Sequence, residues 1–305
     1  MCCNIRVFWE RTVVNKRMNQ IFLITAYKES DYLYEMARTM SERGIGIYIH
    51  WDKKSVTEDI LTKLNSIKNV KAISKYKVPW GGYQHVQAIL YLLKMAYEED
   101  EKFDYVHVLT GQDCLCGSVE RLVSFFDKDN TKNYMSLSDA NAGNTFRYRT
   151  YYRNDWINYK SCIGKFCTKA FYILQKAVGI NRRTPNNYKV YKGMVYVSIK
   201  REFAEYVLHF LDTPEGKIFS EWIKWCFIPE EFFFQTIIMN SPYKDTVCNN
   251  NYRYALWKKK HGTQPGILDM DDYENIIKSE AFFARKMDWN ISKKLIKKLD
   301  LDGRS

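Results

Sequence analysis

Several features are missing from this 305-residue chain, and each absence excludes a class of protein. No stretch approaches the roughly 18 consecutive apolar residues of a transmembrane helix. The first 17 residues lack the long apolar core of a signal peptide, so residues 1–17 are expected to be a leader or a start-site extension. Only 6 prolines occur, and no linker-like tract or internal repeat divides the chain. One compact domain is therefore expected.

Motifs for metal and nucleic-acid binding are also missing. The eight cysteines show no zinc-site spacing, and no pair of histidines follows Cys114 and Cys116 at ligand distance. Without a secretory signal, the thiols are expected to be reduced and mostly buried. The net charge of +12 favours an anionic partner: nucleic acid, a membrane surface or a phosphorylated substrate. No nucleic-acid-binding module accompanies the scattered lysines, so nucleic acid is disfavoured.

Apolar runs alternate with helix-like segments through the first half of the chain. Strands are expected at 20–27, 45–52, 70–74, 105–113 and 133–137, and helices at 30–44, 57–67, 85–99 and 118–127. Such alternation with short connections predicts an α/β fold with a mostly parallel sheet flanked by helices. Loops and short helices are expected over 138–190, followed by a strand at 191–199 and helices at 201–211 and 216–227.

Polar residues follow two of the predicted strands. His50 and Asp52 end the second strand, and Asp113 ends the run at 105–113. Ligands of parallel α/β sheets bind beyond the carboxyl ends of the strands, which suggests a nucleotide pocket here. The alternative is ordinary loop capping by the same three side chains.

The segment "IPEEFFFQT" places two adjacent carboxylates, Glu230 and Glu231, between a proline and three phenylalanines. A carboxylate beside apolar surface costs free energy unless it is paired or used. The simplest alternative is a helix N-terminus, with Pro229 in the first turn and both carboxylates favoured by the helix dipole.

Seven segments together resemble the core-2/I-branching glycosyltransferases, which include β-1,6-N-acetylglucosaminyltransferases and xylosyltransferases. They are "YIHWDKKS", "WGGYQHVQAILYLL", "VLTGQDCLC", "YKGMVYVSI", "IPEEFFFQT", "YRYALW" and "FFARKMDW", in the family's order and spacing. The resemblance implies a GT-A-like domain over 18–290, a nucleotide-sugar donor and transfer with inversion.

The resemblance also implies roles for individual residues. Glu231 takes the place of the catalytic base, which removes a proton from the acceptor hydroxyl. Arg253 and Lys286 take the places of basic donor-binding residues that replace a metal, and Arg285 competes with Lys286. Asp-x-Asp pairs occur at 127/129, 269/271 and 300/302, but they do not follow core strands and are interpreted as solvated turns.

Further binding residues are expected on both sides of the site. His50, Asp52 and Asp113 are expected to bind the donor nucleotide. The acceptor is expected near Trp80, Gly193, Tyr196 and Glu230. Where the family commonly has a small residue and a tryptophan, this chain has Met194 and Tyr196.

The leading hypothesis is metal-independent transfer of N-acetylglucosamine from its uridine diphosphate donor to a glycan hydroxyl, of the β-1,6 branching type. The alternatives are transfer of xylose or another sugar to a peptide or polysaccharide, and an inactive glycan-binding protein. The absence of an anchor segment favours a bacterial-type enzyme located in the cytoplasm.

The final segment, 291–305, is expected to be a basic amphipathic tail. One helical face carries Ile291, Leu295, Ile296 and Leu299, and the other carries Lys293, Lys294, Lys297 and Lys298. Two interpretations remain open, namely docking on the domain or weak contact with the inner face of an anionic membrane.

Overall fold

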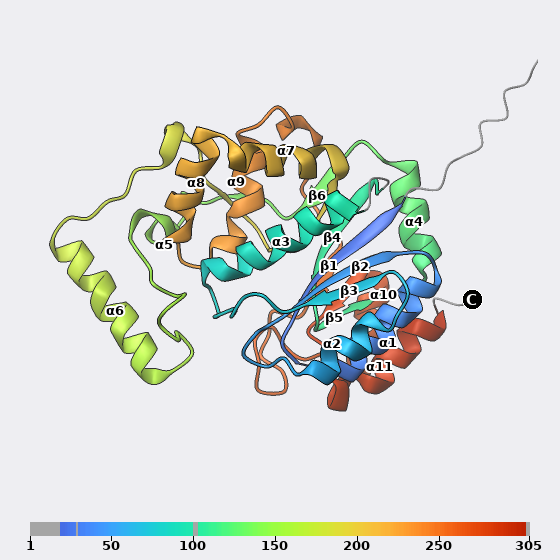
Figure 1. The fold of residues 1–305 in the computed structure, drawn as a ribbon. Coiled ribbons are helices and arrows are strands. Elements are labelled where there is room, and N and C mark those ends of the chain that lie inside the picture. The colour runs from blue at the N-terminus through green and yellow to red at the C-terminus, as the bar shows by residue number, and fades with distance from the viewer. Residues whose placement is uncertain (1–18, 29, 100–102, 303–305) are drawn as a thin grey trace, which may run out of the picture.

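The computed structural model of the chain describes residues 19–28, 30–99 and 103–302 (Figure 1). The leader expected at 1–17 and the last three residues of the tail lie outside the described residues.

A seven-stranded sheet forms the centre of the fold, with the strand order β10-β6-β9-β4-β1-β2-β3. Its strands are β1 (Gln20–Ala26), β2 (Gly46–Trp51), β3 (Val70–Ile73), β4 (Tyr105–Thr110), β6 (Asn133–Met135), β9 (Val197–Lys200) and β10 (Val247–Cys248). The pairs β1–β2, β1–β4, β2–β3 and β6–β10 are parallel, whereas β9 is antiparallel to β4 and β6. The predicted mostly parallel α/β fold is confirmed.

The central strand β1 is buried on both faces, which explains why its sequence is a continuous apolar run. Because side chains alternate along a strand, Ile21 and Leu23 belong to one hydrophobic cluster and Phe22 and Ile24 to the other. Helices therefore have to cover both faces of the sheet.

Helices lie on both sides of the sheet (Figure 1). One side carries α3 (Tyr83–Glu99), α7 (Arg201–Asp212), α8 (Pro214–Lys224) and α9 (Phe233–Met239), and the other carries α1 (Ser30–Glu42), α2 (Glu58–Asn65), α10 (Tyr273–Lys278) and α11 (Trp289–Asp302). The remaining α-helices of the described residues are α4 (Val119–Lys128), α5 (Phe146–Arg149) and α6 (Cys162–Ala177), and the 3₁₀-helices are η1 (Pro185–Asn187), η2 (Pro229–Glu231), η3 (Lys244–Thr246) and η4 (Met270–Asp272).

Two predicted strands are each divided in the structure. The run at 105–113 ends as β4 at Thr110, and Asp113 begins β5 (Asp113–Leu115) in a second sheet of order β11-β12-β5, with β11 at Arg253–Ala255 and β12 at Phe283–Arg285. The run at 191–199 divides into β8 (Tyr191–Lys192), paired with β7 (Ser138–Asp139), and β9. Between β8 and β9, Gly193 packs directly on the carbonyl of Ser136.

The expectation of loops and short helices over 138–190 was wrong in one respect. This region contains α6, a 16-residue helix that begins at Ser161, whose hydroxyl accepts a hydrogen bond from the Gly164 amide. The helix has no apolar stripe facing a core, because its buried positions are Gly164, Thr168 and Gln175. The large apolar residues of α6 therefore lie on its exposed side, which is the reverse of the pattern that marks a helix packed on a core.

The C-terminal segment forms α11, as its periodicity predicted. Leu295 and Leu299 are fully buried in the core cluster shared with β1, and Ile296 is half-buried against it. The four lysines of the tail are exposed. Docking on the domain is therefore one established role of this helix.

Candidate active site

The two adjacent carboxylates lie on η2, a tight turn held in an unusual backbone conformation. Pro229 occupies the first turn, as expected, and Ile228 before it adopts φ 55° and ψ 63°. This left-handed conformation is rare for a β-branched residue and persists only where the surroundings enforce it. The Ile228 amide donates to the carbonyl of Gly81 at 3.1 Å, and its carbonyl accepts from Arg147 Nη2 at 3.3 Å.

Arg147, which the sequence analysis did not identify, holds this turn together. Its buried guanidinium also donates from Nε to the Phe227 carbonyl at 3.2 Å and stacks 4.4 Å from the ring of Phe232. Its Nη1 lies 2.8 Å from Oε2 of Glu231. One side chain therefore fixes both the backbone of the turn and the direction of the Glu231 carboxylate.

The Glu231 side chain is partly accessible, at 36%, although its surroundings are largely apolar. Burial raises the pKa of its carboxyl above the usual 4.5, and the positive charge of Arg147 offsets part of that rise. The following phenylalanines, Phe232, Phe233 and Phe234, are buried in the core. A reachable carboxylate with a raised pKa has the properties of a general base.

The neighbouring carboxylate, Glu230, is buried and has different partners. Its Oε1 lies 3.2 Å from Nδ1 of His85, and Nε2 of His85 lies 3.0 Å from the hydroxyl of Thr25 at the end of β1. Among the described residues, Oε2 of Glu230 has no hydrogen-bond partner. This chain of contacts ties η2 to the start of α3 and the central sheet.

The second sheet carries three charged residues that are far apart in the sequence, namely Asp113, Arg253 and Arg285. Arg285 on β12 lies opposite Asp113 on β5 and Ala255 on β11. Its Nε donates to Oδ1 of Asp113 at 3.0 Å, and Oδ2 of Asp113 accepts from the amide and hydroxyl of Thr110 at 2.5 and 2.9 Å. Asp113 therefore anchors Arg285 in this structure. Its expected contact with the donor stays a prediction.

Arg253, on the adjacent strand β11, has unused hydrogen-bonding capacity. Its Nη1 donates to the carbonyl of Asn251 at 2.8 Å, and the guanidinium stacks 4.0 Å from the ring of Phe283. Its Nε and Nη2 are buried and have no partner among the described residues. Burial lowers the pKa of Arg253 to about 10, so the group is charged at neutral pH. Buried unpaired donors of this kind suit an anionic ligand.

Lys286 adds a further positive charge at the end of β12. Burial, followed by the charges of Lys28, Arg285 and Lys160, lowers the pKa of its ammonium. Like charges that disfavour one another are stabilised when an anion binds among them. The charge of Arg285 acts on both Arg253 and Lys286, so these three residues form one basic cluster; Lys28 beside it is paired with Asp288 at 3.3 Å.

A short segment connects the Glu231 turn to this basic cluster. The amide of Gly193 donates to the carbonyl of Glu231 at 2.8 Å, and the ring of Tyr196 lies 4.4 Å from the guanidinium of Arg285. Three residues span at most about 11 Å, so this segment links the backbone of the Glu231 turn to Arg285 over a short distance. A Cβ at Gly193 would lie 1.8 Å from the Ser136 carbonyl oxygen, so only glycine fits there.

The two polar residues at the end of β2 hold a neighbouring loop. The amides of Lys75 and Tyr76 donate to Nε2 of buried His50 at 3.2 and 2.9 Å, and burial lowers the pKa of this imidazole to about 4. The amides of Lys54 and Val78 donate to Oδ1 of Asp52 at 3.0 and 3.2 Å. These contacts are loop capping, and a role of His50 or Asp52 in donor binding stays a prediction.

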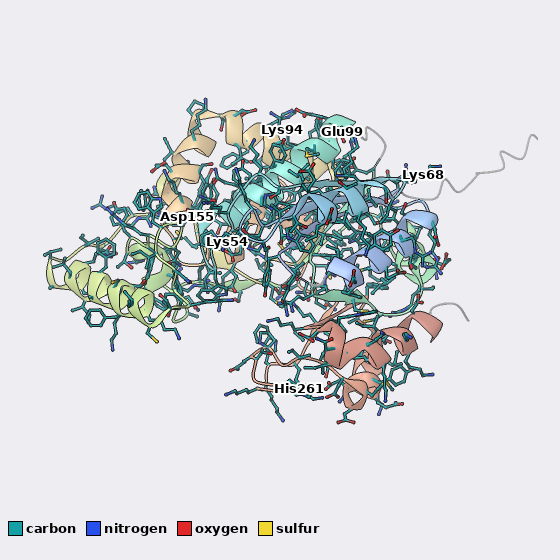
Figure 2. All side chains as sticks on the ribbon, turned by 60° about the horizontal axis from the view of Figure 1, so that its bottom comes forward. Lys54, Lys68, Lys94, Glu99, Asp155 and His261 are labelled. Atoms are coloured by element: carbon teal, nitrogen blue, oxygen red, sulfur yellow. The ribbon has the colours of Figure 1, made fainter. Side chains whose placement is uncertain are left out.

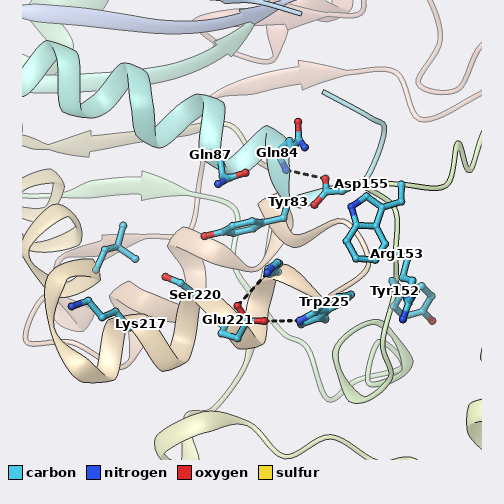
Figure 3. Close-up of a pocket in the computed structure, with 13 residues that line it drawn as sticks. Tyr83, Gln84, Gln87, Tyr152, Arg153, Asp155, Lys217, Ser220, Glu221 and Trp225 are labelled. Carbon is cyan, nitrogen blue, oxygen red and sulfur yellow. Dashed lines mark hydrogen bonds and ion pairs between the residues drawn. The ribbon is translucent and has the colours of Figure 1, made fainter. Parts of the chain in front are cut away.

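An aromatic surface lies beside the start of α3. Trp80 is 43% exposed and stacks on Tyr159, with ring centroids 5.2 Å apart. The ring of Phe227 contacts both Trp80 and Tyr152, and Tyr152 lines a groove of about 450 Å³ (Figure 3). Its aromatic lining residues are Tyr83, Tyr152, Trp156 and Trp225.

The groove lies close to the buried carboxylate of η2. The amide of Gln84 donates to Oδ1 of Asp155 at 3.1 Å, as drawn in Figure 3. Burial raises the pKa of Asp155, and the charge of Glu230 contributes to the rise. The charge of Glu230 on η2 therefore reaches Asp155 in the lining of the groove.

The described residues contain no group of three or more His, Cys, Asp or Glu side chains that could hold a metal ion. Of the Asp-x-Asp residues, Asp129 accepts from the hydroxyl of Thr131 at 2.9 Å. Asp269 is paired with Lys260 and with His261, which lies on the loop at the bottom of Figure 2. Independence from metal stays a prediction.

The expectations about thiols and membrane-spanning helices can be compared with the described part of the chain. The six cysteines in the described part of the chain are free thiols; Cys114, Cys116 and Cys226 are buried. Within 19–28, 30–99 and 103–302, no helix has both the length and the apolar character needed to cross a bilayer. The expected location in the cytoplasm stays a prediction.

Comparisons with known proteins agree with these features. The model of the family described as "Core-2/I-Branching enzyme" matches residues 21–277. Xylosyltransferase 1 of Rattus norvegicus is 24% identical over 300 residues, covering 91% of this chain and 34% of the relative. Xylosyltransferase 2 of the same species is 23% identical over 272 residues, covering 83% and 30%. The chain thus spans about a third of the length of these relatives.

One solved structure that the chain matches is the apo-form glycosyltransferase GlyE of Streptococcus pneumoniae TIGR4. It has a TM-score of 0.33 and 10% identity, and the match covers 93% of this chain and 60% of that one. The family model, by contrast, extends over most of the sequence and contains six of the seven segments that carried the resemblance. The chain belongs to the core-2/I-branching enzyme family.

Proposed function

We propose that this chain is an inverting glycosyltransferase that moves a sugar from a uridine diphosphate donor to a hydroxyl of an acceptor. The observation that carries the proposal is the pairing of a reachable, raised-pKa carboxylate with a basic cluster one short segment away. Glu231 supplies the carboxylate, and Arg253, Arg285 and Lys286 supply the cluster.

In the proposed reaction, Glu231 accepts the proton of the acceptor hydroxyl as that oxygen attacks the anomeric carbon of the donor. The bond between the anomeric carbon and the diphosphate oxygen breaks on the opposite face, which inverts the configuration. The negative charge that develops on the leaving diphosphate is stabilised by the guanidinium of Arg253 and the ammonium of Lys286. No metal is required in this scheme.

The donor nucleotide is proposed to lie over the carboxyl ends of β1 and β2, near His50 and Asp52. On the acceptor side, we assign Trp80, Gly193, Tyr196 and Glu230. Trp80 offers an aromatic face to a sugar ring, and the groove of Figure 3 continues that surface with further aromatic side chains. Gly193 acts by allowing the close approach of the backbone.

Two donor sugars are supported by different observations. The motif resemblance favours N-acetylglucosamine and a β-1,6 linkage to a glycan. The names of the relatives, xylosyltransferases 1 and 2, favour xylose and a different acceptor. Both donors place the same diphosphate on the same cluster, so the basic cluster does not distinguish them.

A donor panel tests the proposal. Binding of uridine diphosphate, its N-acetylglucosamine, xylose and glucose conjugates, and a guanosine diphosphate sugar is measured by thermal shift, with and without EDTA. Slow hydrolysis of the donors is followed in parallel. We expect uridine nucleotides to raise the melting temperature of the protein in the presence of EDTA. We also expect one nucleotide-sugar to be hydrolysed faster than the others. If the protein binds glycans but none of the nucleotides, the result supports the alternative of an inactive glycan-binding protein.

A further inference from the structure

Helix α6 presents its apolar side chains to solvent. Large apolar residues of this helix are between 56 and 77% exposed: Ile163, Phe166, Ile173, Leu174 and, directly after its last turn, Val178. Figures 1 and 2 both place α6 at the edge of the molecule, away from the central sheet. The side that packs on the protein is formed by Gly164, Thr168 and Gln175.

Both polar and aromatic contacts attach the helix to the chain. The half-buried rings of Phe171 and Tyr172 lie 5.8 Å from the guanidinium of Arg153 and 6.4 Å from the ring of Phe146. The side-chain amide of Gln175 accepts from the amide of Tyr151 at 2.6 Å and donates to its carbonyl at 2.9 Å. A Cβ at Gly164 would lie 1.9 Å from the carbonyl oxygen of Asn158, so the first turn sits directly on the preceding loop. This orientation is therefore fixed by specific contacts, and the apolar side is left uncovered.

The exposed surface has the distribution of charge typical of an interfacial helix. At about 100° per residue, Ile163, Phe166, Ile173, Leu174 and Val178 fall within an arc of ~140°. The lysines at 165, 169 and 176 fall within a stripe of ~40° between that arc and the buried side. An apolar face bordered by lysines is the pattern of helices that lie in the surface of a bilayer.

The sequence around α6 is basic over a long range. Between Asp155 and Glu202 the chain contains ten lysines and arginines and no aspartate or glutamate. A second copy of the chain packed on this surface would bring two such basic regions together. An anionic lipid surface is instead complementary both to the charge and to the exposed apolar arc.

We propose that α6 is a membrane-surface anchor, inserting its apolar arc among the acyl chains of an anionic bilayer while its lysines contact lipid phosphates. The proposal does not depend on sugar transfer. It differs from attachment through α11, whose apolar face is already buried in the domain.

The anchor would also orient the active site. Tyr159, in the loop before α6, stacks on Trp80 of the aromatic surface, and the charge of Lys160 acts on Lys286 in the basic cluster. A bilayer beneath α6 would therefore hold the acceptor side of the site close to the membrane surface.

Flotation of the full chain with lipid vesicles tests the anchor. Vesicles of phosphatidylcholine alone are compared with equal parts phosphatidylcholine and phosphatidylglycerol, at low and high salt. We expect binding to the anionic vesicles that weakens with salt. The triple variant Phe166→Gln, Ile173→Gln, Leu174→Gln should lose binding, and Lys165→Glu, Lys169→Glu, Lys176→Glu should weaken it about 100-fold.

Matched variants control for composition. Ile218→Gln with Ile277→Gln removes exposed apolar residues from α8 and α10, and Lys293→Glu, Lys294→Glu, Lys297→Glu removes charge from α11. Both should bind vesicles like the unmodified chain, and thermal melting should show every variant folded. Loss of binding only in the α11 variant overturns the proposal, as does equal binding by all variants or none by the unmodified chain. An α6-dependent dimer without vesicle binding assigns the surface to a second copy instead.

Discussion

Arg147 and Glu231 form an ion pair, with Nη1 2.8 Å from Oε2, while the same guanidinium binds the backbone of the turn that carries Glu231. The arrangement couples the position of the carboxylate to its pKa. Burial alone would push the pKa of Glu231 higher than its partner allows, so Arg147 limits the rise. The consequences for catalysis can be separated by substitution.

Glu231→Gln is expected to lower turnover about 10²-fold or more, because the amide cannot accept the acceptor proton. Binding of uridine diphosphate and the melting temperature should change little. Transfer assays on saturating donor check this. Glu215→Gln, an exposed carboxylate on α8 outside the groove, serves as the matched control, and near-normal turnover of the Glu231 variant would refute the assignment.

The acid limb of the pH profile of kcat/KM should lie above the usual glutamate pKa of 4.5. The base must be ionised, so activity is lost as pH falls through its raised pKa. Arg147→Gln removes the charge that opposes the rise, and the limb should move to higher pH. Arg147→Lys keeps the charge and should leave the limb near its original place while lowering the rate.

Arg147→Gln should also destabilise the turn, by about 1–3 kcal/mol, because the carbonyls of Phe227 and Ile228 lose a charged donor. Partial exposure of Glu231 keeps the ion-pair share of this cost small. Urea denaturation measures it. An unshifted acid limb in both variants would mean that another group sets the profile.

Arg253→Ala and Lys286→Ala should each weaken binding of uridine diphosphate by about 1.5–3 kcal/mol, since each removes a charged hydrogen-bond donor from the phosphates. Isothermal titration calorimetry in EDTA checks this. Lys94→Ala, on the exposed surface of α3, is the matched control. Activity that disappears in EDTA and returns with manganese would contradict the metal-free scheme.

Trp80→Ala should raise the acceptor KM and leave uridine diphosphate binding unchanged, because the indole is assigned to the acceptor side. Steady-state kinetics with soluble acceptors separates the two effects. Phe166→Ala removes an even more exposed ring from α6 and should be neutral in that assay. A loss of nucleotide affinity in the Trp80 variant would move this residue to the donor side.

Leu295→Ala is expected to cost about 2–5 kcal/mol of stability, because it leaves a cavity in a fully buried part of the core. Deleting 291–305 should unfold the protein for the same reason. Lys297→Ala, on the exposed side of α11, is the control. A folded, stable deletion variant would show that the tail does not contribute to the core.

The sequence by itself determined the sheet and the order of its strands along the chain. Short continuous apolar runs such as 20–26 and 105–110, alternating with helical segments, are typical of strands buried on both faces, so β1 and β4 were predictable. The adjacent carboxylates Glu230 and Glu231 after Pro229 marked this turn as unusual, and the resemblance to the family implied the role of Glu231, which stays a prediction.

Tertiary structure alone decided which partners those residues have. Arg147 on α5 meets Glu231, and His85 at the start of α3 meets Glu230, only because both helices lie against η2. His50 lies near the end of β2, whereas Asp113 begins β5; backbone amides donate to Nε2 of His50, and Thr110 and Arg285 donate to Asp113. Sequence patterns report burial and periodicity, whereas long-range contacts depend on how the elements are placed. Helix α6 was not predicted for the same reason. Its large apolar residues face solvent, and the sequence does not show which side of the helix the rest of the protein covers.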